Sequence, residues 1–109
     1  MKSVENAVYI ESMRKKGSDL DMVRRVTLTL SFLTIEDRGA FLKDVPRLGF
    51  TPGGAFWQGE STHPACCTVS GFTSLSLPKL NKFTARAISA AAPLEGMLTD
   101  IEAEFVKRY

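Results

Sequence analysis

Apolar and polar residues alternate strictly along residues 25–32 of the chain. The apolar set is Val26, Leu28, Leu30 and Phe32, and the polar set is Arg25, Thr27, Thr29 and Ser31. A period of two places the two sets on opposite sides of an extended backbone, which predicts a half-buried strand. One face of the sheet that contains this strand is therefore expected to stay polar and open to a partner.

A helix is expected before this strand, within residues 1–17. Ser3 stands at its start as a cap, three cations at 14–16 fill its last turn, and Gly17 follows them. Positive charge in the last turn and a glycine just beyond it are typical stop signals. Its apolar residues are Val4, Val8, Tyr9 and Met13. Because a face of small hydroxyls is only weakly apolar, we expect this helix to pack against an edge of the sheet rather than cover it.

Three further elements follow the first strand. Residues 34–37, Thr-Ile-Glu-Asp, resemble a capping box and predict a helix that ends at Pro46 or Gly49. Residues 50–57 are apolar but contain Pro-Gly-Gly, which predicts a short, irregular edge strand. The small and β-branched residues at 65–71 predict a strand that forms a hairpin with it.

A third helix and a last strand complete the pattern. Ser74 or Ser76 is the expected cap, Pro78 lies in the first turn, and the helix must end before Pro93. Its expected buried face is Leu80, Phe83, Thr84, Ala87, Ile88 and Ala91. Residues 97–105 alternate again and predict an amphipathic strand. Its expected inner residues are Met97, Thr99, Ile101, Ala103 and Phe105, and its outer residues are Leu98, Asp100, Glu102 and Glu104.

This order of elements predicts an α+β fold of the ferredoxin-like type. Two interleaved strand-helix-strand units with right-handed crossovers give a βαββαβ antiparallel sheet with two helices on one face, preceded by the N-terminal helix. A chain of 109 residues forms one domain, here 1–109, with the N-terminal helix in 1–17 and the ferredoxin-like core in 22–109. The first and last strands are then neighbours, so Arg25 is expected to oppose an acidic residue of the last strand.

Composition narrows the function classes. Hydrophobic residues make up 44%, charged residues 24%, and the net charge is +2, which argues against disorder and against a strong nucleic-acid field. No apolar run approaches the length of a membrane span, and residues 1–6 lack the apolar core of a signal peptide. We expect a cytoplasmic protein without a membrane association, either a monomer or a homodimer.

The N-terminal half carries a family resemblance. Residues 6–50 contain a short helix, Gly17-Ser18-Asp19-Leu20, a strand ending in Phe32, a second helix and Leu48-Gly49-Phe50. This run resembles the RraB family, whose founding members are protein regulators of ribonuclease E, and the rest of the chain is compatible with it. The resemblance implies a ferredoxin-like fold and a non-enzymatic regulator that inhibits a ribonuclease.

Cys66 and Cys67 are the residues that most invite a chemical role. Neighbouring residues of a strand point to opposite faces, so these thiols cannot both bind one tetrahedral ion, and no metal or cofactor is expected. Cys67 is expected in the core, as free cysteines usually are. A small thiol-dependent enzyme that uses Cys66 or Cys67 with His63 as base remains an alternative, although a third group to orient the base is not evident.

Direct RNA binding is not expected. RNA-recognition modules of this topology stack bases on outward aromatic residues of their central strands. The corresponding outward positions here are Thr27, Thr29, Ser31, Cys66, Thr68 and Ser70. None is aromatic, so we expect no direct contact with nucleic acid.

The acidic residues of the last strand are the leading candidate for a partner-binding site. Asp100, Glu102 and Glu104 beside Thr27 and Thr29 would complement a basic surface of another protein, such as a ribonuclease or a toxin. The alternative is a solvated strand that deters edge pairing. Phe56 and Trp57 form a second candidate, since aromatic residues are enriched at binding hot spots. An immunity protein that inhibits a toxin is thus an alternative to the ribonuclease regulator.

Overall fold

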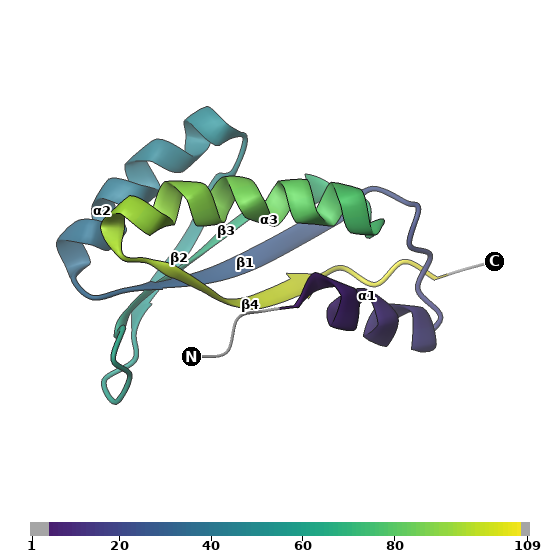
Figure 1. The fold of residues 1–109 in the computed structure, drawn as a ribbon, viewed down its shortest axis with the longest axis horizontal. Coiled ribbons are helices and arrows are strands. Elements are labelled where there is room, and N and C mark those ends of the chain that lie inside the picture. Colours follow the sequence, from purple (N-terminus) through teal and green to yellow (C-terminus); the bar gives the residue numbers. More distant parts are fainter. Residues whose placement is uncertain (1–4, 108–109) are drawn as a thin grey trace.

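A computed structural model describes residues 5–107 (Figure 1). Within this range the chain forms an α+β fold with one antiparallel sheet of four strands and three α-helices. The elements are α1 (Asn6–Lys15), β1 (Arg24–Phe32), α2 (Ile35–Asp44), the 3-10 turn η1 (Val45–Leu48), β2 (Thr51–Trp57), β3 (Ala65–Thr73), α3 (Leu77–Ala91), the 3-10 turn η2 (Ala92–Leu94) and β4 (Met97–Ala103).

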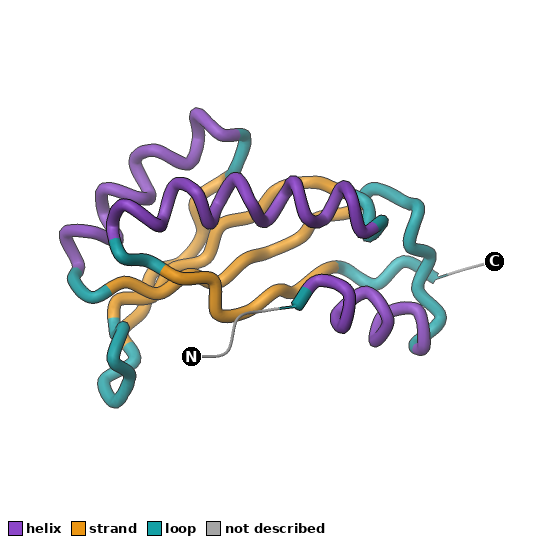
Figure 2. The backbone as a smooth tube through the Cα atoms, in the orientation of Figure 1, coloured by secondary structure: helices purple, strands orange, loops and turns teal. Residues whose placement is uncertain are grey.

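The sheet has the strand order β2-β3-β1-β4, so the first strand lies in its interior. Helices α2 and α3 lie on the same face of the sheet, as Figures 1 and 2 show. The inward apolar residues of β1 are fully buried there. At their centre, Leu28 is paired with Val69 of β3 on one side and with Ile101 of β4 on the other. The alternation read from the sequence therefore places the hydrophobic core between the sheet and these two helices.

The predicted boundaries of α2 are confirmed. Thr34 Oγ1 accepts a hydrogen bond from the backbone N–H of Asp37 at 3.1 Å, which is the cap of the first turn. The helix passes into η1 before Pro46, and Gly49 ends the turn with a φ of 90°. A left-handed conformation favours glycine at this position, so the chain can reverse there into β2.

The predicted buried face of α3 is correct except at one residue. Ser76 is the N-cap of the helix, and the predicted apolar residues face the sheet, but Ile88 is 46% exposed. Ala87 and Ala91 lie one turn apart and are fully buried. Ile88 follows Ala87 by one residue, about 100° around the helix, and this rotation carries it to the solvent side.

A bulge in β4 makes part of the predicted alternation wrong. Asp100 pairs with Thr29, but the next pair joins Leu98 to Leu30, so one residue of β4 is left over. Leu98 is consequently buried on the helix side, whereas Met97 moves to the outer face and Thr99 is exposed. The extra residue is held by the Thr99 hydroxyl, which donates to the backbone oxygen of Thr29 at 3.2 Å.

Helix α1 packs at the β4 edge of the sheet and beside the start of α3. Tyr9 Oη accepts a hydrogen bond from the backbone N–H of Ala103 at 2.7 Å. Asn6 Nδ2 donates to Asn81 Oδ1 at 2.8 Å and to Thr84 Oγ1 at 3.0 Å. The helix thus leaves the outer face of the sheet uncovered, while the expected cap Ser3 and the apolar Val4 lie outside the described residues.

The end of α1 is closed by the Gly17-Ser18 pair. Gly17 has a φ of 85°, and the backbone N–H of Ser18 donates to the Met13 carbonyl at 3.1 Å. A left-handed glycine followed by a hydrogen bond back to the last turn is a Schellman-type helix end. The stop signal read from the sequence therefore acts as predicted.

A buried arginine fastens this turn to the start of β1. Arg24 is only 3% exposed, and its guanidinium donates to Ser18 Oγ at 2.7 Å, to the Asp19 carbonyl and to the Met22 carbonyl at 3.1 Å. Burial lowers the pKa of Arg24 from its usual value. The positive charge is thus held by neutral oxygens, and we call this arrangement the Arg24 clasp.

The Arg24 clasp also holds the last described part of the chain. The backbone N–H of Asp19 donates to the Val106 carbonyl at 2.6 Å, and that of Val106 donates to Ser18 Oγ at 3.3 Å. Arg24 itself reaches the Glu104 carbonyl at 3.4 Å. The Gly-Ser-Asp element is therefore the point where the α1–β1 loop and the segment after β4 are joined.

Candidate protein-binding surface

The face of the sheet opposite α2 and α3 is uncovered by any helix within the described residues, and we call it the open face. Its centre carries short hydroxyl side chains that are half-buried against one another. The outward residues of β1, β3 and β4 are Arg25, Thr27, Thr29, Ser31, Cys66, Thr68, Ser70, Phe72, Met97, Asp100 and Glu102. This surface is flat and polar at its centre, with larger side chains at its ends.

The five predicted residues on β1 and β4 lie together at one side of the open face. Glu102 is paired with Thr27, and Asp100 is paired with Thr29. Glu104 follows β4 directly, and its Oε1 accepts a hydrogen bond from the backbone N–H of Arg25 at 3.1 Å. Asp100, Glu102 and Glu104 are all exposed. We call these three the acidic edge.

Arg25 lies opposite an acidic residue at the end of the last strand, as predicted, because the backbone N–H of Glu104 donates to the Arg25 carbonyl at 3.1 Å. The contact with Glu104 uses the Arg25 backbone, and the guanidinium lies over the ring of Phe72, with 5.8 Å between the carbon Cζ and the ring centroid. A cation over an aromatic face is a favourable arrangement. Because Phe72 is 66% exposed, the two side chains form a solvent-accessible pair at one end of the open face.

Phe56 and Trp57 do not form one patch. Phe56 is paired with Cys66 and shares the open face, whereas Trp57 is paired with Ala65, whose side chain is buried in the core. Successive residues of a strand point to opposite faces, so the two rings are directed to different sides of β2. Both are exposed, at 46% and 58%, but β2 is the strand at the far side of the sheet from the acidic edge.

The two cysteines point to opposite faces, as predicted, and both are buried and free. Cys67 lies in the core, and burial raises the pKa of its thiol to about 11. A nucleophilic cysteine needs the opposite shift, toward the thiolate at neutral pH. The environment of Cys67 therefore favours a packing role.

Cys66 is covered by the β2–β3 hairpin. Its Sγ lies 3.3 Å from Ser31 Oγ, 3.8 Å from Gln58 Oε1 and 3.8 Å from the carbonyl oxygen of His63. The ring of His63 instead meets the hydroxyl of Thr62, with 3.2 Å between Nδ1 and Oγ1. The contact between Cys66 and His63 thus uses the backbone, which does not provide a general base.

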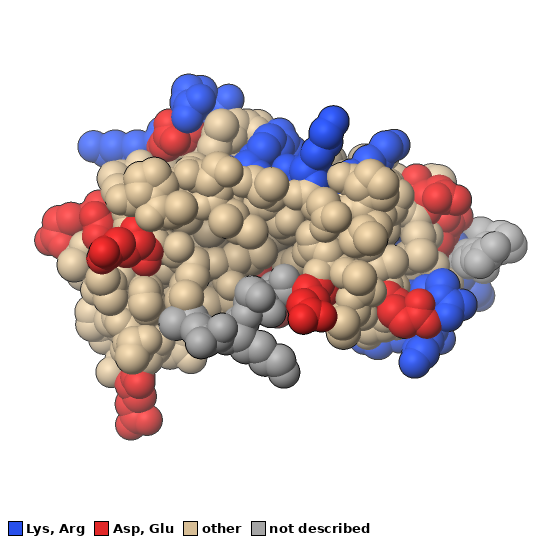
Figure 3. All heavy atoms as spheres, viewed as in Figure 1, with Lys and Arg blue, Asp and Glu red and all other residues tan. Residues whose placement is uncertain are grey.

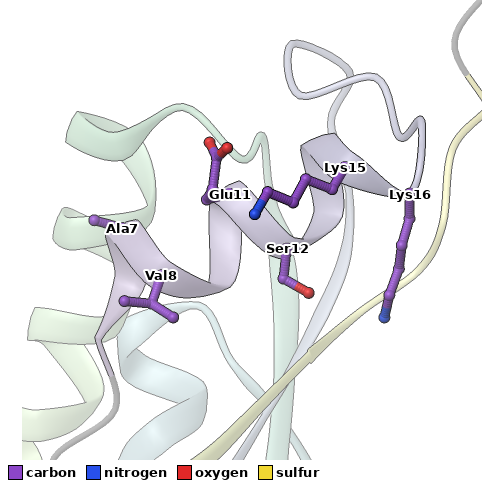
Figure 4. Close-up of a pocket in the computed structure, with 6 residues that line it drawn as sticks. All are labelled: Ala7, Val8, Glu11, Ser12, Lys15 and Lys16. Atoms are coloured by element: carbon purple, nitrogen blue, oxygen red, sulfur yellow. The ribbon is translucent and has the colours of Figure 1, made fainter.

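Other chemical sites are not apparent in residues 5–107. No group of three or more histidine, cysteine or acidic residues in this range is placed to hold a metal ion. Across the same residues, no helix combines the length and apolar character that a bilayer crossing requires. A hollow of about 620 Å³ lies along α1, and every described residue that lines it belongs to that helix or its C-terminal cap (Figure 4). It brings no polar groups together from different elements.

Two residues of the open face were missed by the sequence reasoning. Phe72 continues the outward series of Thr68 and Ser70. It was missed because the strand was expected to end at Gly71, whereas β3 continues to Thr73. Met97 reaches the open face because of the bulge in β4, for which the alternation gives no signal.

Two comparisons of the sequence with known proteins give the same result. No protein-family model matches the chain, and a search of curated proteins finds no match.

Proposed function

We propose that this chain is a non-enzymatic cytoplasmic regulator that binds another protein through the open face, with a ribonuclease of the E type as its partner. The observation that carries the proposal is the uncovered open face with its acidic edge beside the hydroxyls of Thr27 and Thr29. An exposed row of carboxylates next to short hydrogen-bonding groups is suited to a basic protein segment.

The architecture supports this proposal. The strand order β2-β3-β1-β4, with α2 and α3 on one face, favours a ferredoxin-like arrangement. The resemblance to the RraB family implies the same arrangement and a regulatory role. The Gly-Ser-Asp element that carries the resemblance is part of the Arg24 clasp, so it supports a shared fold. The choice of partner must then rest on the chemistry of the open face.

The spacing of the acidic edge suits an extended partner. Asp100 and Glu102 are two residues apart in β4, and such residues lie about 7 Å apart on one face of a strand. Arginines at every second position of an extended segment have the same separation. Guanidinium groups pair with carboxylates through two parallel hydrogen bonds, which favours arginine over lysine in that segment.

Charge reversal at the acidic edge tests the proposal. We choose Asp100→Lys with Glu102→Lys and leave Glu104 unchanged, because the Glu104 carboxylate accepts the hydrogen bond from Arg25. The matched control is Asp21→Lys with Glu60→Lys, two exposed positions outside the sheet that give the same change in net charge. The measurements are fluorescence anisotropy with an arginine-rich segment of ribonuclease E and the rate at which that enzyme cleaves single-stranded RNA.

We expect the wild-type chain to bind the segment and slow cleavage, and the acidic-edge variant to bind about tenfold more weakly or worse. The control variant should stay within about twofold of wild type, since its charges lie away from the contact. No binding and no inhibition by the wild-type chain would show that the partner is wrong. Undiminished binding by the acidic-edge variant would place the contact elsewhere, first at the exposed rings of Phe56 and Trp57.

A further inference from the structure

A second charged surface lies on the side of α3 that faces away from the sheet. Lys79, Lys82 and Arg86 are spaced at i, i+3 and i+7 and therefore form one stripe along the helix. Figure 3 shows Lys and Arg side chains gathered above α3 and the neighbouring η1 segment. The stripe and the open face lie on different sides of the molecule, because α3 separates the stripe from the sheet.

A groove runs along this stripe. A hollow of about 480 Å³ lies between η1 and α3, and a second of about 430 Å³ continues it toward Thr73 at the end of β3. Lys82 and Arg86 line both hollows, so the two adjoin at these side chains, and we call them together the α3 groove. Its first part has Leu48, Ala85 and Ala90 among its lining residues, with Arg47 on the η1 side. Among the described lining residues of both hollows, none is acidic.

The cations that line the α3 groove differ from one another in the contacts that their charged groups make. The guanidinium of Arg86 donates to the Leu48 carbonyl at 2.9 Å and lies over the rings of Phe50 and Phe83, at 5.2 Å and 5.7 Å from their centroids. It is thus fixed in place before any ligand arrives. Lys79 and Lys82 form no ion pair with residues 5–107, and both are exposed. The fourth cation, Arg47, is paired with the Asp44 carboxylate at 2.9 Å. Two exposed lysines and the fixed Arg86 therefore remain as the cations of the groove that have no carboxylate partner within residues 5–107.

We propose that the α3 groove binds an acidic, amphipathic helical segment of a protein partner. Small apolar side chains such as Ala85 and Ala90 allow a second helix to approach closely, and the flanking cations suit carboxylates on its polar side. The stripe from Lys79 to Arg86 spans about 10 Å along α3, which matches carboxylates two turns apart on the partner helix.

The same lining argues against single-stranded RNA as the occupant. Phosphates would use the cations, but bases need exposed aromatic faces for stacking. Phe50 and Phe83 are only 3% and 2% exposed, and Arg86 covers both rings. The apolar residues that line the groove, Leu48, Ala85 and Ala90, form what we call its apolar floor. This floor contributes to binding only when the ligand also has an apolar side, as an acidic amphipathic helix does.

The test uses a fluorescein-labelled helical peptide of two heptads, with glutamate along one side and leucine along the other. Its controls are a peptide of the same composition in scrambled order and an oligouridine of equal charge. The protein variants are Lys79→Glu with Lys82→Glu, and as matched control Lys15→Glu with Lys16→Glu on α1. All four lysines are exposed, and far-UV circular dichroism checks that each variant folds, because Lys15 and Lys16 also lie at the C-terminal end of α1, where positive charge is favourable.

The amphipathic peptide should bind the wild-type chain, and binding should weaken about tenfold or more in the α3 variant and less than about twofold in the α1 variant. Equal affinity for the scrambled peptide would overturn the role of the apolar floor. Tighter binding of oligouridine would assign the groove to nucleic acid instead. An α3 variant that binds like wild type would remove the site altogether. These outcomes are independent of the open face, because the variants leave the acidic edge intact.

Discussion

Replacement of Arg24 by methionine should destabilise the fold strongly, because the guanidinium is the centre of the Arg24 clasp. Methionine keeps the buried aliphatic volume but removes every donor. The two main hydrogen bonds that are lost are the buried one to Ser18 Oγ at 2.7 Å and the partly buried one to the Asp19 carbonyl. Hydrogen bonds to charged groups contribute about 1.5–3 kcal/mol each, so these two account for at least about 3 kcal/mol.

A smaller effect opposes this loss. Burial lowers the pKa of Arg24, because a charge is less favourable away from water, and the methionine variant buries no charge at this position. The variant also loses the longer, partly buried hydrogen bonds to the carbonyls of Met22 and Glu104. We take the stability lost with these two bonds to be about equal to the stability gained by burying no charge. The expected net loss is therefore about 3 kcal/mol of unfolding free energy, a large part of the 5–15 kcal/mol typical of a domain.

The neighbouring arginine provides the control. Arg25→Met removes the same charge one residue away, where the guanidinium lies over Phe72 on the exposed surface. An exposed cation–π contact contributes about 0.5–1 kcal/mol, so this variant should stay within about 1 kcal/mol of wild type. Urea denaturation followed by far-UV circular dichroism measures both. Equal losses in the two variants, or a loss below about 1 kcal/mol for Arg24→Met, would refute the structural role assigned to the clasp.

Two further predictions concern the free energy of unfolding. Gly96→Ala should lower the free energy of unfolding by about 1–3 kcal/mol, since the new Cβ would come within 2.2 Å of Phe32 Cε2. Gly39→Ala should raise it by about 0.5–1 kcal/mol, because Gly39 lies in α2 with open space around its Cα. Urea denaturation measures both changes, and two changes of the same sign would contradict this packing. Stability should also fall as the pH rises from about 9 to about 11, because the unfolded thiol of Cys67 loses its proton at lower pH than the folded one. Cys67→Ala should reduce this slope, and an unchanged slope would show that another group causes it.

The sequence was sufficient where one local signal decides the structure. The alternation in β1 reports burial on one face, and the Thr34 cap and the Gly17 stop each depend on residues within one or two helical turns. The placement of the acidic edge on the open face followed from the same local alternation, although it was predicted for an unbroken strand.

Other features depend on contacts between distant segments. Burial of Arg24 requires oxygens from the loop after α1 and from Glu104, so its position at the start of a strand gives no hint of it. The bulge in β4 arises from its pairing with β1, and the pattern of residues 97–105 looks equally regular without it. The α3 groove was missed because η1 supplies its other side, 31 residues or more before Lys79 in the chain.

The interior position of β1 also affects how the chain can reach its fold. Its two neighbours, β3 and β4, come from residues 65–73 and 97–103, so both edges of β1 lack their native partners until much later parts of the chain are present. Residues 26–32 are uncharged and rich in β-branched and apolar side chains, the composition that pairs readily with strands of other molecules. During synthesis this segment waits for its partners, and the arginines at 24 and 25 lie directly beside it as charged residues that discourage association between copies.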